Sequence, residues 1–139
     1  MLGHHPLPNN VRYSPQKVFD IAKNDSYRWP MATPEKKVKD KIVKVLKDQG
    51  VYYFFPATHG YGRSGVPDII CCCNGVFIGI ECKAGVNKPT ALQEKEMRDI
   101  RNAGGITKVI NEDNIVEVLE VITYAQEYGN SHGSYGEPS

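Results

Sequence analysis

The sequence lacks any apolar run near the roughly 20 residues that a membrane-spanning helix needs. Its first ten residues, MLGHHPLPNN, contain neither a cationic flank nor an apolar segment, so they do not resemble a secretion signal. From these two absences we expect a cytoplasmic protein that has no membrane partner.

Cysteine is scarce, and its placement is poor for cross-links. Three of the four cysteines are consecutive, which suits neither a disulfide framework nor a CxxC zinc site; the four are Cys71, Cys72, Cys73 and Cys82. The four histidines form no HxxxH or HxxE pair. We expect reduced thiols in an apolar core and no zinc.

The chain also lacks an excess of charge of one sign. Its net charge is +1, so bulk electrostatics does not indicate a nucleic-acid binder. Locally, residues 35–48 hold six lysines against three acids, and residues 111–127 hold five acids and no lysine or arginine. A lysine-rich helix is usually a solvated face, phosphate contact is the alternative, and charge alone does not decide between them.

The patterns along the 139 residues predict one folded domain between two simpler ends. Residues 1–32 read as an N-terminal arm, in which Ser14 and Pro15 open a short helix. Residues 33–127 carry the periodic apolar patterns of the domain. Residues 128–139 are small and polar, which is typical of a disordered tail.

Within the domain the elements follow one another as α-β-β-β-α-β-α. Helices are expected at 34–49, 91–103 and 114–126, with strands at 51–55, 66–73, 76–82 and 106–110. Thr33 and Thr90 are the expected helix caps, and Gln93 completes a capping box. The aromatic run 52–55 is expected in the core rather than as a base-stacking platform. This order predicts an α/β fold with a central mixed sheet flanked by helices.

Asn74-Gly75 joins two apolar runs, which is a strong signal for a hairpin with a type I′ turn. With that turn, the residue numbers of two opposing residues sum to 149, so Asp68 faces Glu81 and Val66 faces Lys83. Side chains alternate between the two faces of a strand, so Asp68, Glu81 and Lys83 share one face. The opposite face is wholly apolar and belongs to the core. A bulge at Gly79 would shift this register.

Two like charges directly opposed on a sheet are destabilising, so the Asp68–Glu81 pair needs a physical reason. A hard divalent cation supplies one, because converging carboxylates suit the oxygen coordination of Mg²⁺ or Mn²⁺. Lys83 would then neutralise charge on a phosphate. The alternative is a surface salt bridge between Lys83 and either acid, worth at most about 1 kcal/mol.

The segment Pro67-Asp68, twelve intervening residues and Glu81-Cys82-Lys83 has the form PD…ExK. The wider pattern is Thr33-Pro34-Glu35, Ser64-Gly65-Val66-Pro67-Asp68-Ile69, Gly79-Ile80-Glu81-Cys82-Lys83, Thr90-Ala-Leu-Gln93 and Ala103-Gly104-Gly105. Over roughly residues 33–125 this resembles the virus-type replication-repair nuclease domain, VRR-NUC, of the PD-(D/E)XK nuclease superfamily. The resemblance implies a restriction-endonuclease-like α-β-β-β-α-β core and a metal-dependent endodeoxyribonuclease.

The resemblance also implies roles for individual residues. Asp68, Glu81 and the backbone carbonyl of Cys82 would bind Mg²⁺ or Mn²⁺, and Glu35 would bind it directly or through water. Lys83 would orient or activate the attacking water, and Gln93 would act near the site. Taken alone, Glu35 is a first-turn acid favoured by the helix dipole, and Gln93 is explained by its capping box. The two roles of Gln93 look only partly compatible.

Free-standing viral and bacterial members of the family are homodimers that act on branched DNA, notably four-way (Holliday) junctions. The resemblance therefore implies branched DNA as partner, a homodimer and, for a viral protein, the host cytoplasm. Arg63, Ser64, Lys36 and Lys37 are the expected phosphate contacts. The alternatives are a flap or restriction-type nuclease, a non-catalytic DNA-binding module on a nuclease fold, and a protein-interaction domain.

Overall fold

The structure is a computed structural model that describes residues 32–57, 60 and 62–129. The expected arm with its short helix, and the tail beyond residue 129, lie outside the described residues. No helix in the described part is long and apolar enough to cross a membrane.

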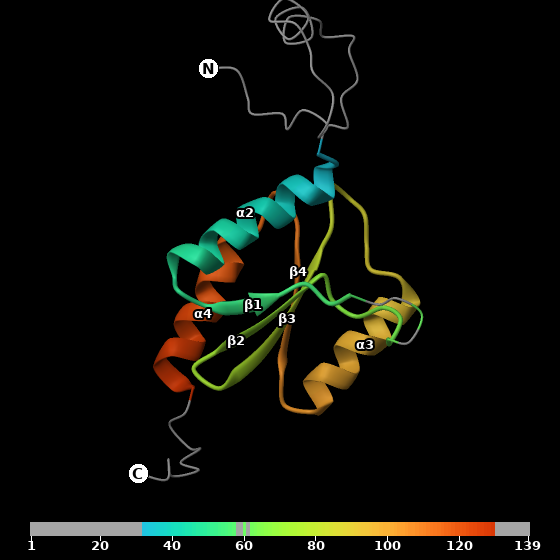
Figure 1. The fold of residues 1–139 in the computed structure, drawn as a ribbon. Helices are drawn as coiled ribbons and strands as arrows, with labels where there is room; N and C mark the ends of the chain where they lie inside the picture. The colour runs from blue at the N-terminus through green and yellow to red at the C-terminus, as the bar shows by residue number, and fades with distance from the viewer. Residues whose placement is uncertain (1–31, 58–59, 61, 130–139) are drawn as a thin grey trace, which may run out of the picture. The chain divides into compact units, whose positions relative to one another are not determined.

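In the described part of the chain, three helices and four strands follow one another in the expected order (Figure 1). They are α2 (Pro34–Asp48), β1 (Tyr52–Phe54), β2 (Ile69–Cys73), β3 (Val76–Cys82), α3 (Ala91–Asn102), β4 (Ile106–Ile110) and α4 (Val116–Tyr128). The strands form one sheet in the order β1-β2-β3-β4, in which β4 runs parallel to β3 and the other pairs are antiparallel. The predicted α/β fold with a mixed sheet and flanking helices is therefore confirmed.

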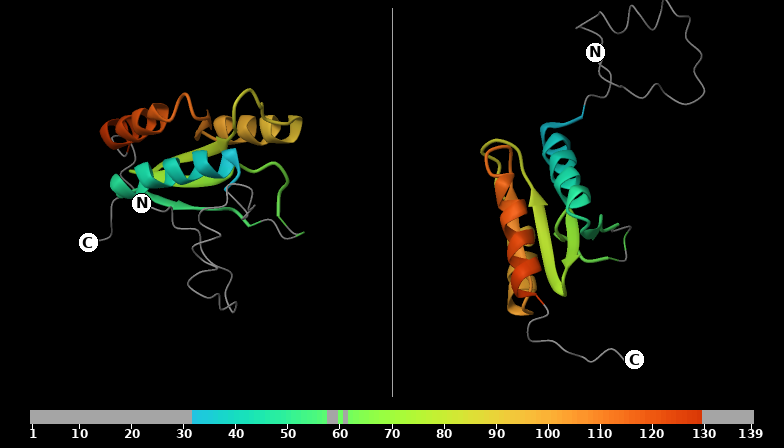
Figure 2. Two further views of the ribbon diagram at one scale, coloured as in Figure 1. Left: turned by 90° about the horizontal axis from the view of Figure 1, so that it is seen from above. Right: turned by 90° about the vertical axis from the view of Figure 1, so that its left-hand side faces the viewer.

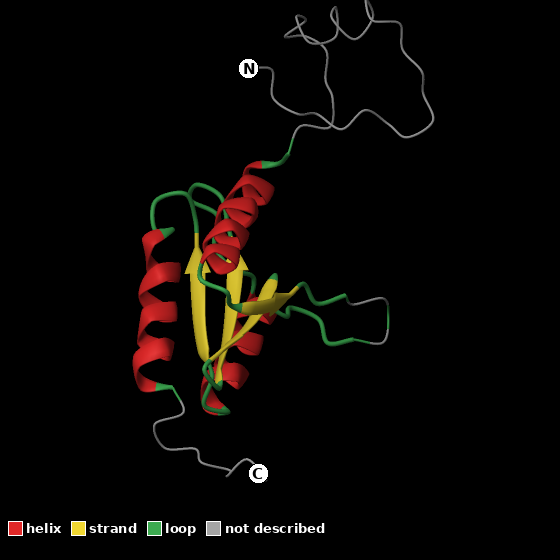
Figure 3. Cartoon of the chain, turned by 60° about the vertical axis from the view of Figure 1, so that its left-hand side comes forward, coloured by secondary structure: helices red, strands yellow, loops and turns green. Residues whose placement is uncertain are grey.

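One face of the sheet makes the core with α2 and α4. Val38, Ile42 and Leu46 of α2 and Val118, Val121, Ile122 and Ala125 of α4 pack against Ile69, Cys71, Cys73, Ile78, Ile80 and Cys82 of the hairpin. Figure 1 shows α2 and α4 on one side of the diagonal strands and α3 on the other, and in the left view of Figure 2 α4 and α3 lie at opposite ends of one edge. Figure 3 likewise shows helices on both sides of the strands. The prediction of an apolar core face is confirmed.

The hairpin has the predicted turn and register. Asn74 and Gly75 have φ of 50° and 80°, as a type I′ turn requires. Cys73 pairs with Val76, and the pairing continues without a bulge to Ile69 and Ile80. The Asn74 side chain also donates hydrogen bonds to the last carbonyls of α4, which ties the turn to that helix.

The expectation that the aromatic run 52–55 lies in the core holds in part for Tyr53, which packs against the core, and is wrong for the other three residues. Tyr52, Phe54 and Phe55 are 69%, 46% and 48% exposed, and Tyr53 is half-buried. The reason is position: β1 is a three-residue edge strand, and α3 packs on β3 and β4, away from it. The Cys72 thiol is exposed on the same face, while the other three thiols are buried as expected.

The last helix begins two residues later than predicted and extends to Tyr128, into the segment expected to be a tail. Asn114 is the cause at its start, because its side chain accepts from the Asn111 N–H at 2.7 Å and donates to the Val109 carbonyl at 3.0 Å. These bonds hold a turn in place of a first helical turn. Leu119 of this helix is 41% exposed, whereas Val121 is buried.

The loop before β2 packs tightly on the start of α3, and Gly65 makes this possible. Its φ is +79°, and a Cβ there would lie 2.7 Å from the backbone carbonyl carbon and oxygen of Leu92. Backbone atoms cannot move aside cheaply. Any other residue at this position would push the loop away from the helix.

We expect Gly65→Ala to lower the free energy of unfolding by more than the roughly 1–3 kcal/mol of a left-handed alanine alone. Urea denaturation at neutral pH measures this. Gly50→Ala is the matched control, since Gly50 also has positive φ (+66°) but nothing within 4 Å of its Cβ position. Equal losses in the two variants would show that the approach to Leu92 carries no cost.

Candidate active site

Asp68 is positioned by the proline before it. Pro67 is fully buried and packs over Gly79 of β3, where a Cβ would lie 2.9 Å from its Cγ and 3.2 Å from Ile100 Cδ1. Asp68 lies one residue before β2, so the strand pairing stops at Ile69–Ile80 and does not include the expected Asp68–Glu81 pair. The Asp68 carboxylate instead accepts the Cys82 backbone N–H at 2.8 Å, which brings it beside Glu81.

Glu81 is a buried carboxylate with incomplete hydrogen bonding. Its relative exposure is 2%, and its Oε1 accepts from Gln93 Nε2 at 2.8 Å. Its Oε2 is buried without a hydrogen-bond partner among the described residues. Burial first, and then the charge of Asp68, raise the pKa of Glu81 to about 8, against the opposing influence of Lys83. The site thus has a shortage of positive charge.

Lys83 follows β3 directly and is the cation nearest to Glu81. Its backbone N–H donates to the Ile110 carbonyl at 2.9 Å, which continues the β3–β4 pairing by one residue. Its Nζ lies 3.6 Å from Glu81 Oε1, and its side chain is 11% exposed. Because both partners are buried, the alternative of a surface salt bridge does not apply.

Gln93 combines two roles that looked only partly compatible. Its Oε1 accepts the Thr90 N–H at 2.8 Å, which completes the capping box of α3. Its Nε2 donates to Glu81. Since one amide offers an acceptor and a donor, the cap fixes the side chain that holds the carboxylate.

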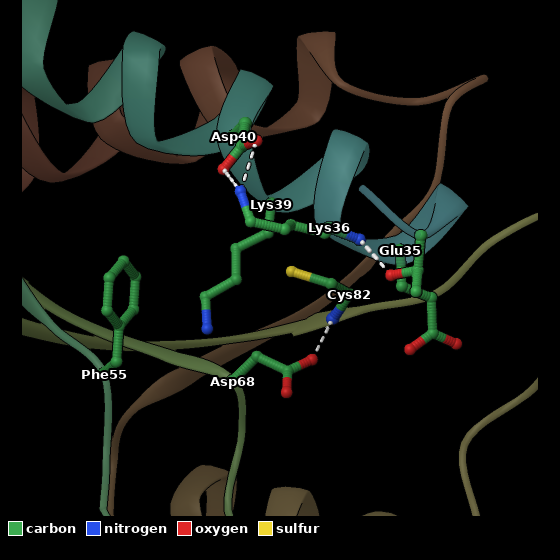
Figure 4. Close-up of a pocket in the computed structure, with 8 residues that line it drawn as sticks. Glu35, Lys36, Lys39, Asp40, Phe55, Asp68 and Cys82 are labelled. Atoms are coloured by element: carbon green, nitrogen blue, oxygen red, sulfur yellow. Dashed lines mark hydrogen bonds and ion pairs between the residues drawn. The ribbon is translucent and has the colours of Figure 1, made fainter. Parts of the chain in front are cut away.

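Glu35 enters the site region from the first turn of α2. It lines a cavity of about 410 Å³ together with Thr33, Lys36, Lys39, Asp40, Phe55, Asp68 and Cys82 (Figure 4). No hydrogen bond or ion pair joins Glu35 to Asp68 or Glu81 within the described part of the chain. The structure therefore brings Glu35 to the same cavity as Asp68 without joining the two acids.

The donors at the site fit a hard divalent cation. No three side chains of His, Cys, Asp or Glu in the described segments gather into a complete metal cage. Mg²⁺, however, keeps several waters and commonly takes only one or two carboxylates from a protein. Asp68 and the unpartnered Glu81 Oε2 offer two, and a cation between them would supply the charge that the buried pair lacks.

The expected DNA contacts lie in different surroundings. Arg63 is paired with two acids of α3, since its Nε lies 2.5 Å from Glu96 Oε1 and its Nη2 lies 3.4 Å from Asp99. Lys36 is bonded to Asp40 at the cavity, and Ser64 and Lys37 are exposed.

Two site residues were missed at the sequence level. Lys39 and Phe55 line the cavity, and Lys39 Nζ lies 4.0 Å from the centre of the Phe55 ring. The i, i+4 spacing from Glu35 to Lys39 could have placed Lys39 near Glu35 on one helix face. The link to Phe55 depends on the tertiary fold.

The sheet topology, the PD…ExK carboxylates and the adjacent lysine define a nuclease with a restriction-endonuclease-like fold. Known proteins agree: the sequence model of the archaeal Holliday junction resolvase (Hjc) family matches residues 35–106, just over half of the chain. The chain belongs to this family. It is also 32% identical over 85 residues, 60% of its own length and 88% of the relative's, to "Putative nuclease p44" of Acyrthosiphon pisum secondary endosymbiont phage 1.

The raised pKa of Glu81 makes stability depend on pH. Between about 4.5 and about 8, the folded protein keeps a proton that the unfolded chain releases, so the free energy of unfolding falls as the pH rises across this window. In EDTA, we expect Glu81→Gln to reduce this slope and to be more stable than wild type above pH 8, because an amide does not ionise. Urea denaturation at pH 5 and 8.5 measures both. Parallel pH profiles would contradict the account of Glu81.

Proposed function

We propose that this nuclease is a metal-dependent, structure-selective DNA endonuclease that hydrolyses phosphodiester bonds. The observation that carries the proposal is the buried, unpartnered oxygen of Glu81 beside Asp68 and Lys83. A buried acid pair is costly unless something compensates it, and a divalent cation does so with the chemistry that the reaction needs.

Each residue then has a defined task. Asp68, Glu81 and the Cys82 carbonyl would hold Mg²⁺ or Mn²⁺, with Glu35 contributing directly or through water. When bound, the cation acidifies water and stabilises charge on the phosphate. Lys83 orients the attacking water and offsets charge that develops on the phosphate oxygens. Gln93 holds Glu81 in the orientation that leaves Oε2 open.

The substrate that we propose is branched DNA such as a four-way junction. Support comes from the family to which the chain belongs. A junction has two symmetric strands to cut, so we propose a homodimer that presents two active sites. Within the superfamily we propose the VRR-NUC branch, and for a phage protein the host cytoplasm, because of the quoted motifs and the phage relative.

Two other functions compete with this one. A flap or restriction-type nuclease would use the same site on another substrate. A non-catalytic DNA-binding module would have no need for a cation beside Glu81, and the intact trio of Asp68, Glu81 and Lys83 argues against it. We propose Lys36, Lys37, Ser64 and Arg63 as phosphate contacts, with Arg63 exchanging its α3 carboxylates for DNA.

The deciding experiment is cleavage of a labelled four-way junction, beside duplex and flap substrates, in Mg²⁺, Mn²⁺ or EDTA. We expect metal-dependent junction cutting by wild type and at least about a 100-fold loss in Lys83→Ala. Lys95→Ala is the control, since it removes an exposed lysine of α3 that pairs with Asp99. Cutting of flaps or duplex would retain the site and reject the junction. A folded, DNA-binding protein that cuts nothing would favour the binding module.

The double role of Gln93 can be separated from simple helix capping. Thr90→Ala removes the hydroxyl that accepts the Gln93 backbone N–H. Gln93→Ala removes the side-chain oxygen that accepts the Thr90 N–H and, in addition, the bond to Glu81. We expect each variant to lose about 1 kcal/mol of stability, but only Gln93→Ala to lose activity by about tenfold or more. Denaturation and single-turnover cleavage on the same samples measure the two effects. Equal activity losses would reduce Gln93 to a cap.

A further inference from the structure

Lys39 differs from Lys36 and Lys44, two other lysines of α2. Lys36 and Lys44 each bind an acid one turn on, at 2.9 Å from Asp40 and Asp48. Within the described residues Lys39 has no such ion pair, because the residue one turn on from it is the apolar Val43. Its Nζ instead lies 4.0 Å from the centre of the Phe55 ring.

The position of this ammonium group is as informative as its partner. Lys39 and Phe55 line the same cavity as Asp68 and Cys82. In Figure 4 the Lys39 side chain descends from α2 to the level of the strands, where its nitrogen lies between the Phe55 ring and Asp68. An aromatic ring thus holds a positive charge at the edge of the proposed catalytic carboxylates.

The choice of an aromatic partner has a chemical consequence. A carboxylate would neutralise Lys39, whereas a ring face orients the ammonium group by a cation–π contact and leaves its charge available to an anion. Phe55 stays 48% exposed in this arrangement. A lysine is long and flexible, so a ring that fixes it reduces the entropy lost when an anion binds.

We propose that Lys39 is a phosphate-binding residue of the active-site cavity and that Phe55 is its positioning residue. Their ligand is a backbone phosphodiester next to the bond that is cut, so the inference rests on the proposed function. Lys39 lines the same cavity as Asp68 and offsets the repulsion between Asp68 and an entering phosphate. The contact carries no base specificity.

A simpler role for Lys39 is to screen Asp68 in the protein without DNA. The two roles differ in how DNA binding responds to salt. A phosphate contact releases a counterion, so its loss lowers the slope of log K against log [salt] by about one. Loss of an internal screening charge weakens binding without removing a contact, and the slope stays the same.

The test is fluorescence anisotropy of an uncut four-way junction and a duplex in EDTA, over a series of KCl concentrations. We expect Lys39→Gln to bind about five- to tenfold more weakly with a slope reduced by about one. Lys47→Gln is the control: it removes the same charge from the same helix, roughly 12 Å further along its axis. We expect its slope to match wild type.

Phe55 is tested by a rescue. Phe55→Leu keeps an apolar side chain but removes the ring, and Phe55→Trp restores a ring. We expect the leucine variant to lose affinity in the same direction as Lys39→Gln and the tryptophan variant to recover it. Thermal unfolding of each variant confirms that the fold is retained.

The outcomes separate this inference from the proposed function. A wild-type slope in Lys39→Gln, or no recovery in Phe55→Trp, overturns the inference even if the protein cuts junctions. A reduced slope with recovery supports the phosphate contact even if no substrate is cut. Failure of the wild type to bind any DNA overturns both.

Discussion

The burial of Glu81 beside Asp68 is the constraint on which the rest of the site depends. Glu81 is 2% exposed, one of its oxygens has no hydrogen-bond partner among the described residues, and its pKa is raised to about 8. A carboxyl group in these surroundings destabilises the sheet. The surroundings compensate it in part. Gln93 donates to one oxygen, Lys83 lies nearby, and the Cys82 N–H holds Asp68 in place. Among the described residues, Glu81 Oε2 is left without a hydrogen-bond partner, and this is the oxygen that the proposed cation would bind.

The scaffold fixes this pair through close backbone approaches. Pro67 can pack over β3 only because Gly79 has no side chain, and the loop before it can reach α3 only because Gly65 has none. The Asn74-Gly75 turn sets the register that places Asp68 at the end of the ladder next to Glu81. Small residues therefore hold the Asp68–Glu81 pair in position.

Sequence reasoning predicted what short-range rules determine. The turn type at Asn74-Gly75 fixed the strand pairs by arithmetic, and the Thr90-Gln93 box located the start of α3, so the trio Asp68, Glu81 and Lys83 was placed together. Reasoning failed where tertiary coverage decides. Tyr52 and Phe54 of β1 look like core residues, but α3 does not cover their face of the edge strand. Arg63 stays a proposed DNA contact, and no local sequence signal indicated its pairing with Glu96 and Asp99, which lie 33 and 36 residues further along the sequence. The contact of Lys39 with Phe55 left no local signal at all.

The central claim is that Asp68 and Glu81 form a cation site, and direct binding of Mn²⁺ to the full-length protein tests it most simply. Isothermal titration calorimetry at pH 8, without DNA, would compare wild type with Asp68→Asn and Glu81→Gln. The account predicts saturable binding by wild type, accompanied by proton release from Glu81, and loss of both the binding and the proton release in each variant. Binding of Mn²⁺ that is the same in all three proteins would contradict it.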